Sequence, residues 1–284
     1  MTDYQTYEGK RLKKQTQSAR WIEGRGSWQE HFILIAAEDT RHSIKLLNHF
    51  DIKTPMTSYH EYNKVDKARY LVGRLEEGVN IALITDAGTP GISDPGEELV
   101  RQCYEAGIQV TSLPGPAACI TALTMSGLST RRFCFEAFLP SEKGDKKERA
   151  RILEELKRET RTIIVYEAPH HLARTLEDLY KVLGDRNITI CRELTKKYET
   201  ACRTTFRESL ERCREEEPRG ECVIVIEGKP LEELRKEQIS RWEDMEIQEH
   251  LACYTDQGMD KKEAMKAVAR DRGITKRDVY QKLL

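Results

Sequence analysis

The sequence predicts an α/β protein with two lobes and a helical C-terminal extension. Short apolar runs of strand length alternate with segments of helix length from Phe32 to about residue 229. Several of these apolar runs end in turns rich in glycine and proline, which is where ligands bind in α/β sheets. After Pro230 the chain becomes charged and purely helical.

The first lobe is expected over residues 33–126, after an atypical polar segment at 1–32. The run IALIT is continuously apolar, which predicts a strand covered on both faces. Glycine stops two of the helices, at Gly78 and Gly107. In chain order the predicted elements are a strand at 32–37, helices at 38–50 and 64–77, a strand at 81–85, a helix at 97–106, a strand at 108–113 and a helix at 117–125.

The second lobe is expected over residues 127–229, followed by the helical extension at 230–284. In the extension, Gly273 is predicted to end one helix and Thr275 to cap the next. Such an appendix binds nucleic acid or protein, or serves only for packing or dimerisation. In chain order the predicted elements are a strand at 132–138, a helix at 145–159, a strand at 162–167, a helix at 171–183, a strand at 188–194, a helix at 207–216, a strand at 221–228, and helices at 249–254, 261–270 and 276–284.

Composition argues against a membrane or secreted protein and favours a cytoplasmic one. No apolar run approaches the ~20 residues of a membrane helix, and the start has no apolar core. The eight cysteines form no C-x-x-C pair, which predicts free thiols. Net charge is −1, but residues 9–28 carry six basic and one acidic residue, and residues 257–284 carry eight basic and four acidic residues. Basic ends suit a polyanion, although ordinary solvated surface is the simpler explanation.

The segment Thr85–Gly96, TDAGTPGISDPG, is the most informative motif. It follows a predicted buried strand and precedes a helix, and its glycines and prolines allow the backbone to approach a ligand closely. Asp86 is suited to accept hydrogen bonds from a ligand hydroxyl or ammonium, whereas Asp94 is placed to cap the following helix. The segment is neither a P-loop nor a G-x-G-x-x-G motif, so a nucleotide-phosphate site is disfavoured.

Three further motifs also follow predicted strands: LPGPAA at 113–118, YEAPHH at 166–171 and CRELTKK at 191–197. Four such loops on one rim predict a single cleft. The pair His170–His171 has no third ligand at suitable spacing, so we interpret it as surface or substrate contact and expect no metal.

The chain resembles the ribosomal-RNA branch of the tetrapyrrole-methylase superfamily, whose members methylate the ribose 2′-hydroxyl of a cytidine in small-subunit ribosomal RNA. The resemblance covers residues 33–284. The segments that carry it are AAEDTRHSIKLLNHF (36–50), SYHEYN (58–63), IALITDAGTPGISDPG (81–96), LPGPAACITAL (113–123), RFCFEAFLP (132–140), YEAPH (166–170), CRELTKKYE (191–199) and GECVIVIEG (220–228).

The resemblance implies a two-lobed tetrapyrrole-methylase-like fold, S-adenosylmethionine in the cleft between the lobes, a homodimer, and 16S ribosomal RNA in the small ribosomal subunit as partner. His60, Glu167 and Asp39 are the candidates for the base that removes the proton of the hydroxyl. Arg41, Arg192 and Lys196, with His60, are the candidates for RNA contact. The implied cofactor contacts are Asp86, Gly88, Thr89, Pro90, Gly91, Ile92, Pro116, Ala117, Ala118, Tyr166 and Leu194.

The start of the chain departs from this family. Family members open with a buried strand and a TPIGNL loop, whereas residues 10–32 here read KRLKKQTQSARWIEGRGSWQEHF. Because that strand and loop belong to the first lobe and its cofactor site, we predict a weakened or absent cofactor site. Two alternatives stay open: a catalytically inactive ribosome- or RNA-binding protein, and a small-molecule methylase of the tetrapyrrole type.

Overall fold

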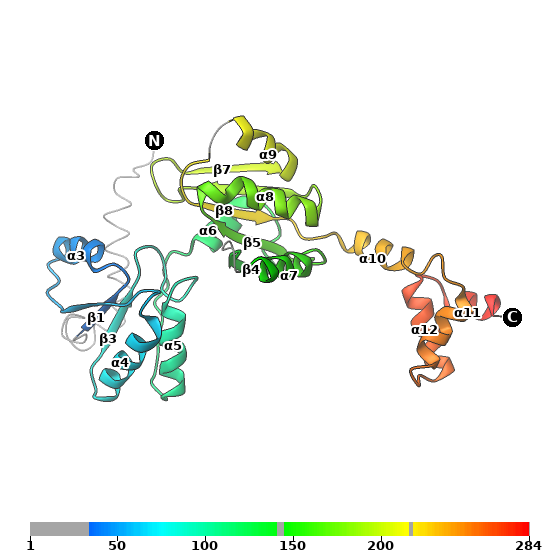
Figure 1. Cartoon of the computed structure of the whole chain (residues 1–284), viewed down its shortest axis with the longest axis horizontal. Coiled ribbons are helices and arrows are strands. Elements are labelled where there is room, and N and C mark those ends of the chain that lie inside the picture. The colour runs from blue at the N-terminus through cyan, green and yellow to red at the C-terminus, as the bar shows by residue number, and fades with distance from the viewer. Residues whose placement is uncertain (1–33, 141–144, 216–217, 284) are drawn as a thin grey trace. The chain divides into compact units, whose positions relative to one another are not determined.

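A computed structural model describes residues 34–140, 145–215 and 218–283 (Figure 1). The chain divides into two compact units, Met1–Ala122 and Leu123–Leu284, and each is described by itself. The atypical segment at residues 1–32 lies outside the described residues, and the domain limits expected from the sequence stay a prediction. Within the described residues, no helix is both long enough and apolar enough to cross a membrane. All eight cysteines are free, as predicted.

The first unit is built on a parallel three-stranded sheet of order β2-β1-β3. Its strands are β1 (Leu34–Ala37), β2 (Met56–Ser58) and β3 (Ile81–Ile84). Ala37 at the end of β1 lies opposite Ser58 and Ile84, the last residues of the other two strands. The carboxyl ends of all three strands, and the loops that follow them, therefore meet at one edge.

Helices cover both faces of this sheet. Successive strand residues point to opposite faces: in β1, Ala36 packs in the cluster that contains Leu71 and Leu99, whereas Ile35 and Ala37 pack with Leu47. Those leucines come from α4, α5 and α3 respectively. The helices of the unit are α3 (Thr40–His49), α4 (Lys64–Glu76), α5 (Gly96–Glu105) and α6 (Ala118–Ser126), the last of which continues into the second unit.

The strand predicted at 108–113 is wrong, because these residues form no strand. Val110 and Leu113 are exposed. A strand exists only through its ladder partner, and among the described residues β3 pairs with β1 alone. β3 is half-buried along its whole length. Both of its faces are nevertheless covered, as expected, since Leu83 packs in the cluster of Ala36 and Ile84 packs in the cluster of Ile35. β2, which has three residues, was not predicted at all.

The second unit contains a mixed five-stranded sheet of order β4-β5-β8-β6-β7. Its strands are β4 (Phe133–Phe138), β5 (Thr162–Glu167), β6 (Asn187–Arg192), β7 (Thr200–Thr205) and β8 (Cys222–Ile226). Both β5 and β6 run antiparallel to the central β8, so they are parallel to each other and end at the same edge. The sequence did not predict β7, whose polar residues TACRTT lack an apolar pattern.

Three helices accompany this sheet, α7 (Lys146–Leu156), α8 (Pro169–Leu183) and α9 (Phe206–Glu215). The α8 residues Leu172, Leu176 and Leu179 are almost fully buried in the core formed with the sheet. The alternating apolar face of β5 and β6 supplies the other side of that core. The predicted α/β fold class is thereby confirmed.

The extension consists of α10 (Leu231–Ser240), α11 (Ile247–Thr255), α12 (Lys261–Asp271) and α13 (Lys276–Lys282). It has a core of its own, in which Leu251, Met265, Val268 and Val279 are buried. Thr275 caps α13 in a capping box with Asp278, as predicted. The sequence did not predict α10.

Candidate functional site

Polar residues follow each strand of the first sheet at its carboxyl edge. Glu38 and Asp39 follow β1, His60 follows β2, and Thr85 and Asp86 follow β3. The carboxylate of Glu38 accepts a hydrogen bond from the Thr85 hydroxyl at 2.7 Å and from the Asp86 backbone N–H at 3.4 Å. This contact joins the ends of β1 and β3 and orients the start of the glycine-rich loop.

Asp94 holds the loop at 85–96 in shape from within. Its carboxylate accepts hydrogen bonds from the backbone N–H groups of Gly91, Ile92 and Gly96, at 2.7–3.1 Å. Gly96 is the first residue of α5, so Asp94 ties down the start of that helix, as the sequence suggested. A Cβ at Gly96 would lie 2.7 Å from Asp94 Oδ1, which explains why glycine occupies this position.

The loops at 85–96 and 113–118 meet at Thr89 and Pro116. The carbonyl oxygen of Pro116 accepts hydrogen bonds from Thr89 N at 2.9 Å and from Thr89 Oγ1 at 3.1 Å. Gly88 has φ +83°, and a Cβ there would lie 3.1 Å from the same carbonyl oxygen. The structure therefore brings the predicted contacts from Asp86 to Ile92 together with those from Pro116 to Ala118.

A cavity of about 430 Å³ opens at the start of the loop at 85–96. It lies between the end of β3 and one side of α3, and Asp86 is exposed in it. The cavity is lined by His42, Ser43, Lys45, Leu46, His49, Ile84, Thr85 and Asp86. The first unit thus combines an accessible carboxylate with a closely packed, glycine-containing backbone.

Two of the three candidate bases, Asp39 and His60, belong to this unit. Asp39 is the N-cap of α3, and its carboxylate accepts hydrogen bonds from Arg41 N, Nε and Nη2 at 2.8–3.2 Å. These hydrogen bonds from the Arg41 side chain and backbone lower the pKa of Asp39 to about 2. A carboxylate held so firmly in its ionised form is a poor proton acceptor.

His60 is held differently. Its backbone N–H donates to Asn63 Oδ1 at 2.9 Å, and its ring Nε2 lies 3.3 Å from Asn63 Nδ2. The other ring nitrogen, Nδ1, is buried and has no hydrogen-bond partner among the described residues. Of the three candidate bases, His60 is the one with a side-chain polar atom that no described residue binds.

The third candidate base, Glu167, lies at the end of β5 in the second unit and is buried. One carboxylate oxygen accepts from the Ala168 N–H at 2.8 Å, and the other accepts from the Thr175 hydroxyl at 2.5 Å. Thr175 in turn accepts from Arg149, which also binds Asp178 and the carbonyl of Pro140. Glu167 therefore belongs to a buried polar network that joins β5, α7 and α8.

Tyr166, the residue before Glu167, belongs to an aromatic cluster. Its ring makes edge contacts with Phe135 and Phe138, with centroids 4.8 and 5.6 Å apart. Phe138 is 54% exposed, so the cluster reaches the surface at the end of the β4–β5 pair. An aromatic surface at a strand end is suited to stack on a planar ring.

The end of β6 lies at the same edge of this sheet, since Glu167 and Arg192 are both paired with Cys222 of β8. The next residues are strained: Glu193 has φ +49° and Thr195 has φ +65°, on either side of Leu194. For a β-branched residue such as Thr195 this conformation is unusual and is often found at functional sites.

The candidate RNA contacts already have partners within the protein. Arg41 is highly exposed but binds Asp39. Lys196 lies 3.2 Å from carboxylate oxygens of both Glu193 and Glu221, and Arg192 Nε lies 3.4 Å from Thr200 Oγ1. A phosphate would have to compete with these groups for each cation.

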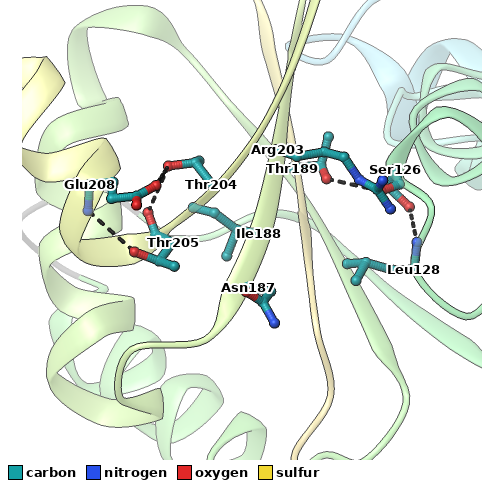
Figure 2. Close-up of a pocket in the computed structure, with 9 residues that line it drawn as sticks. All are labelled: Ser126, Leu128, Asn187, Ile188, Thr189, Arg203, Thr204, Thr205 and Glu208. Carbon is teal, nitrogen blue, oxygen red and sulfur yellow. Dashed lines mark hydrogen bonds between the residues drawn. The ribbon is translucent and has the colours of Figure 1, made fainter.

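A second cavity, of about 440 Å³, includes none of the predicted site residues (Figure 2). In it, Arg203 Nε donates to the carbonyl oxygen of Ser126 at 2.8 Å, and Thr204 Oγ1 donates to Glu208 at 2.9 Å. These polar groups thus form hydrogen bonds with one another, which indicates that they hold α6, β7 and α9 together.

The sequence alone did not identify Glu38 or Arg149 as important. Glu38 lies in the same AEDTR segment as Asp39, and nothing in the sequence distinguishes which carboxylate reaches β3. Arg149 lies in a charged helix where it resembles its exposed neighbours. Within the described part of the chain, no group of three or more His, Cys, Asp or Glu side chains is arranged to hold a metal ion.

Comparison with known proteins identifies the relatives of this chain. The family described as Tetrapyrrole (Corrin/Porphyrin) Methylases matches residues 17–210, so the match begins inside the segment at 1–32 that the sequence analysis set apart. A Halalkalibacterium halodurans protein named ribosomal RNA small subunit methyltransferase I is 48% identical over 246 residues, which cover 87% of this chain and 83% of the relative. The Bacillus subtilis protein of the same name is 45% identical over the same shares of both chains.

A solved structure supports the fold independently. The crystal structure of the methyltransferase CobJ matches with a TM-score of 0.50 at 18% identity, covering 69% of this chain and 94% of CobJ. At that identity the likeness concerns the fold alone.

Proposed function

The chain belongs to the tetrapyrrole methylase family, and on that basis we propose that it transfers a methyl group from S-adenosylmethionine to the ribose 2′-hydroxyl of a cytidine in 16S ribosomal RNA. Relatives at 45–48% identity that span most of the chain are named ribosomal RNA small subunit methyltransferase I. That name favours an RNA substrate over a tetrapyrrole, although the family is called after the latter.

The junction of Thr89 with Pro116 is the observation that carries this proposal. It holds two glycine-containing loops together beside the exposed Asp86. The residues there suit the cofactor: Asp86 offers a carboxylate to an ammonium or ribose hydroxyl, and the small side chain of Ala118 suits a flat adenosyl group. Gly88 lets its own loop approach Pro116 closely. The proposed cofactor contacts in this unit are completed by Gly88, Thr89, Pro90, Gly91, Ile92, Pro116 and Ala117. The contacts expected at Tyr166 and Leu194 stay a prediction.

The bound cofactor would supply a methyl group already activated by its positively charged sulfur. The protein then has to orient the ribose hydroxyl in line with that methyl and remove its proton. We assign the proton transfer to His60, because Asp39 is held by Arg41 and Glu167 is enclosed in its own network. Arg192 and Lys196 are proposed to contact RNA phosphates after exchanging their internal partners.

A second candidate, a catalytically inactive RNA-binding protein, is favoured by one observation. Among the described residues, β3 is paired on one side only and residues 108–113 form no ladder. If this edge stays open in solution, the loops that follow it will be poorly held and the cofactor will bind weakly. We also propose that the protein forms a homodimer and that it acts in the cytoplasm. Light scattering measures whether the protein is a dimer.

Labelled methyl transfer separates these candidates. Small ribosomal subunits that lack the modification and a porphyrinoid are each incubated with the protein and labelled S-adenosylmethionine. We expect label in the ribosomal RNA and none in the porphyrinoid, and a large loss with D86A. Label in the porphyrinoid alone would contradict the RNA assignment, while binding to the subunits without labelling would identify the inactive alternative.

A further inference from the structure

The extension separates its charges between two halves. Residues 230–256, which contain α10 and α11, carry eight acidic and three basic residues, whereas residues 257–284, which contain α12 and α13, carry eight basic and four acidic residues. The halves pack on each other: Arg272 Nε lies 3.1 Å from Nδ1 of the buried His250, and Leu251 shares a buried apolar cluster with Met265 and Val268. One folded piece therefore presents a basic part built on an acidic part.

The basic half has the form of a helix-turn-helix. Four residues, 272–275, separate α12 from α13, and Gly273 in this turn has φ +63°. The turn packs closely against α10, because a Cβ at Gly273 would lie 2.7 Å from Ile239 Cδ1 of that helix. Val268 and Ala269 before the turn and Val279 after it are buried, which fixes the two helices against each other (Figure 1, orange to red).

Apart from Arg272, whose guanidinium binds His250, five cations of this half have no ion-pair partner among the described residues: Lys261, Lys262, Lys276, Arg277 and Lys282. By contrast, Lys266 and Arg270 pair with Glu263 and Asp271. The pKa of Glu263 in α12 is lowered first by its hydrogen bond to Lys266, and in addition by the positive charge of Lys276 in α13.

We propose that α12 and α13 form an RNA-binding surface that holds phosphates of the substrate through these five cations. The choice of RNA rests on the proposed function, whereas the presence of a polyanion site rests on the charges alone. A protein partner is disfavoured, because lysine is depleted at protein interfaces and aromatic side chains are enriched. On this pair of helices Tyr280, 56% exposed, is the one large exposed aromatic side chain.

The mode of contact follows from helix length and RNA shape. The major groove of A-form RNA is too deep and narrow for a helix to read base edges, and α13 has only seven residues. Contacts to phosphates on the outside of a duplex remain, and these are independent of sequence. The surface would therefore strengthen binding without selecting the target nucleotide, which is left to the catalytic lobes.

Salt dependence of binding tests this surface directly. The full chain carrying K276Q/R277Q/K282Q is titrated against a duplex fragment of small-subunit ribosomal RNA between 50 and 200 mM salt. Loss of three phosphate contacts should reduce the slope of log Kd against log salt by about 2 to 3. Over that fourfold range, binding by the unmodified protein should weaken by about 16- to 64-fold more than binding by the variant.

The matched control neutralises the three cations of the acidic half, R235Q/K236Q/R241Q, all of which are exposed. It should leave the slope unchanged, and K261Q/K262Q should reduce it by about 1 to 2. The proposal would be overturned if the control and the triple variant reduced the slope equally, or if the triple variant left the slope unchanged. A reduction of the slope that is seen with duplex DNA and not with duplex RNA would also overturn it. The assay needs no methyl transfer, so an inert enzyme would still give a clear answer.

Discussion

The carbonyl oxygen of Pro116 receives both polar hydrogens of Thr89, from the backbone nitrogen at 2.9 Å and from the hydroxyl at 3.1 Å. Residues 27 positions apart are thus joined at the point where two predicted ligand-binding loops meet. Because one carbonyl accepts both hydrogen bonds, small changes next to it should affect both loops. The first prediction uses this sensitivity.

Replacing Gly88 with alanine should weaken S-adenosylmethionine binding by at least tenfold. The new Cβ would lie 3.1 Å from Pro116 O in a backbone of φ +83°, so the loops must separate slightly. Gly78→Ala is the control, since Gly78 has φ +87° but nothing within 4 Å of its Cβ. Both variants should lose stability, and only Gly88→Ala should lose affinity in calorimetric titration. Equal affinities in the two variants would place the cofactor elsewhere.

His60→Gln should lower kcat by about 10²- to 10⁴-fold with little change in KM, as expected for loss of a general base. Asp39→Asn should keep most of the activity. The pKa of Asp39, about 2, lies below its ordinary value of 3.8, so the carboxylate is ionised throughout the neutral range and cannot shape the pH profile there. Rates measured from pH 5 to 9 check both statements. A large loss of kcat in Asp39→Asn, with His60→Gln active, would reverse the assignment.

Arg149→Leu should destabilise the protein by about 3 kcal/mol, since it leaves Asp178, Thr175 and the Pro140 carbonyl without their donor. Arg151→Leu, on the same helix, is the matched control. Arg151 binds Glu148 and Glu155 but is exposed, so its loss should cost much less stability than the loss of Arg149. Urea unfolding measures the difference between the two. Similar costs would mean that the buried network is not stabilising.

Replacing residues 1–33 with the corresponding start of the Bacillus subtilis relative should raise S-adenosylmethionine affinity. Among the described residues, the edge of β3 away from β1 is unpaired, residues 108–113 form no ladder, and residues 109–113 are exposed. A strand paired with this edge should slow hydrogen exchange at 81–84 and 108–113 and steady the loops that follow. Mass spectrometry of exchange reads these segments separately from 187–192 in the second unit, which should not change. Unaltered exchange and affinity would mean that the native start is sufficient.

Local pattern determined much of this protein. The alternation of apolar runs with helical segments predicted most of the elements, and the long motifs around Asp86 and Pro116 indicated the family and the loops of the site. The capping box at Thr275 and the helix stops at Gly78 and Gly107 could also be predicted, because a helix end depends on residues within one turn of it.

Only the tertiary structure decided questions that depend on residues far apart in the chain. Residues 108–113 have a strand pattern but no strand partner in the part of the chain that the structure describes, whereas β7 lacks the pattern and is held by β6. The sequence could not show that Glu38 binds Thr85 while Asp39 is occupied by Arg41, or that Arg149 is buried while Arg151 is exposed. The physical reason is that a ladder, an ion pair or a buried hydrogen bond takes its energy from a partner that local sequence does not specify.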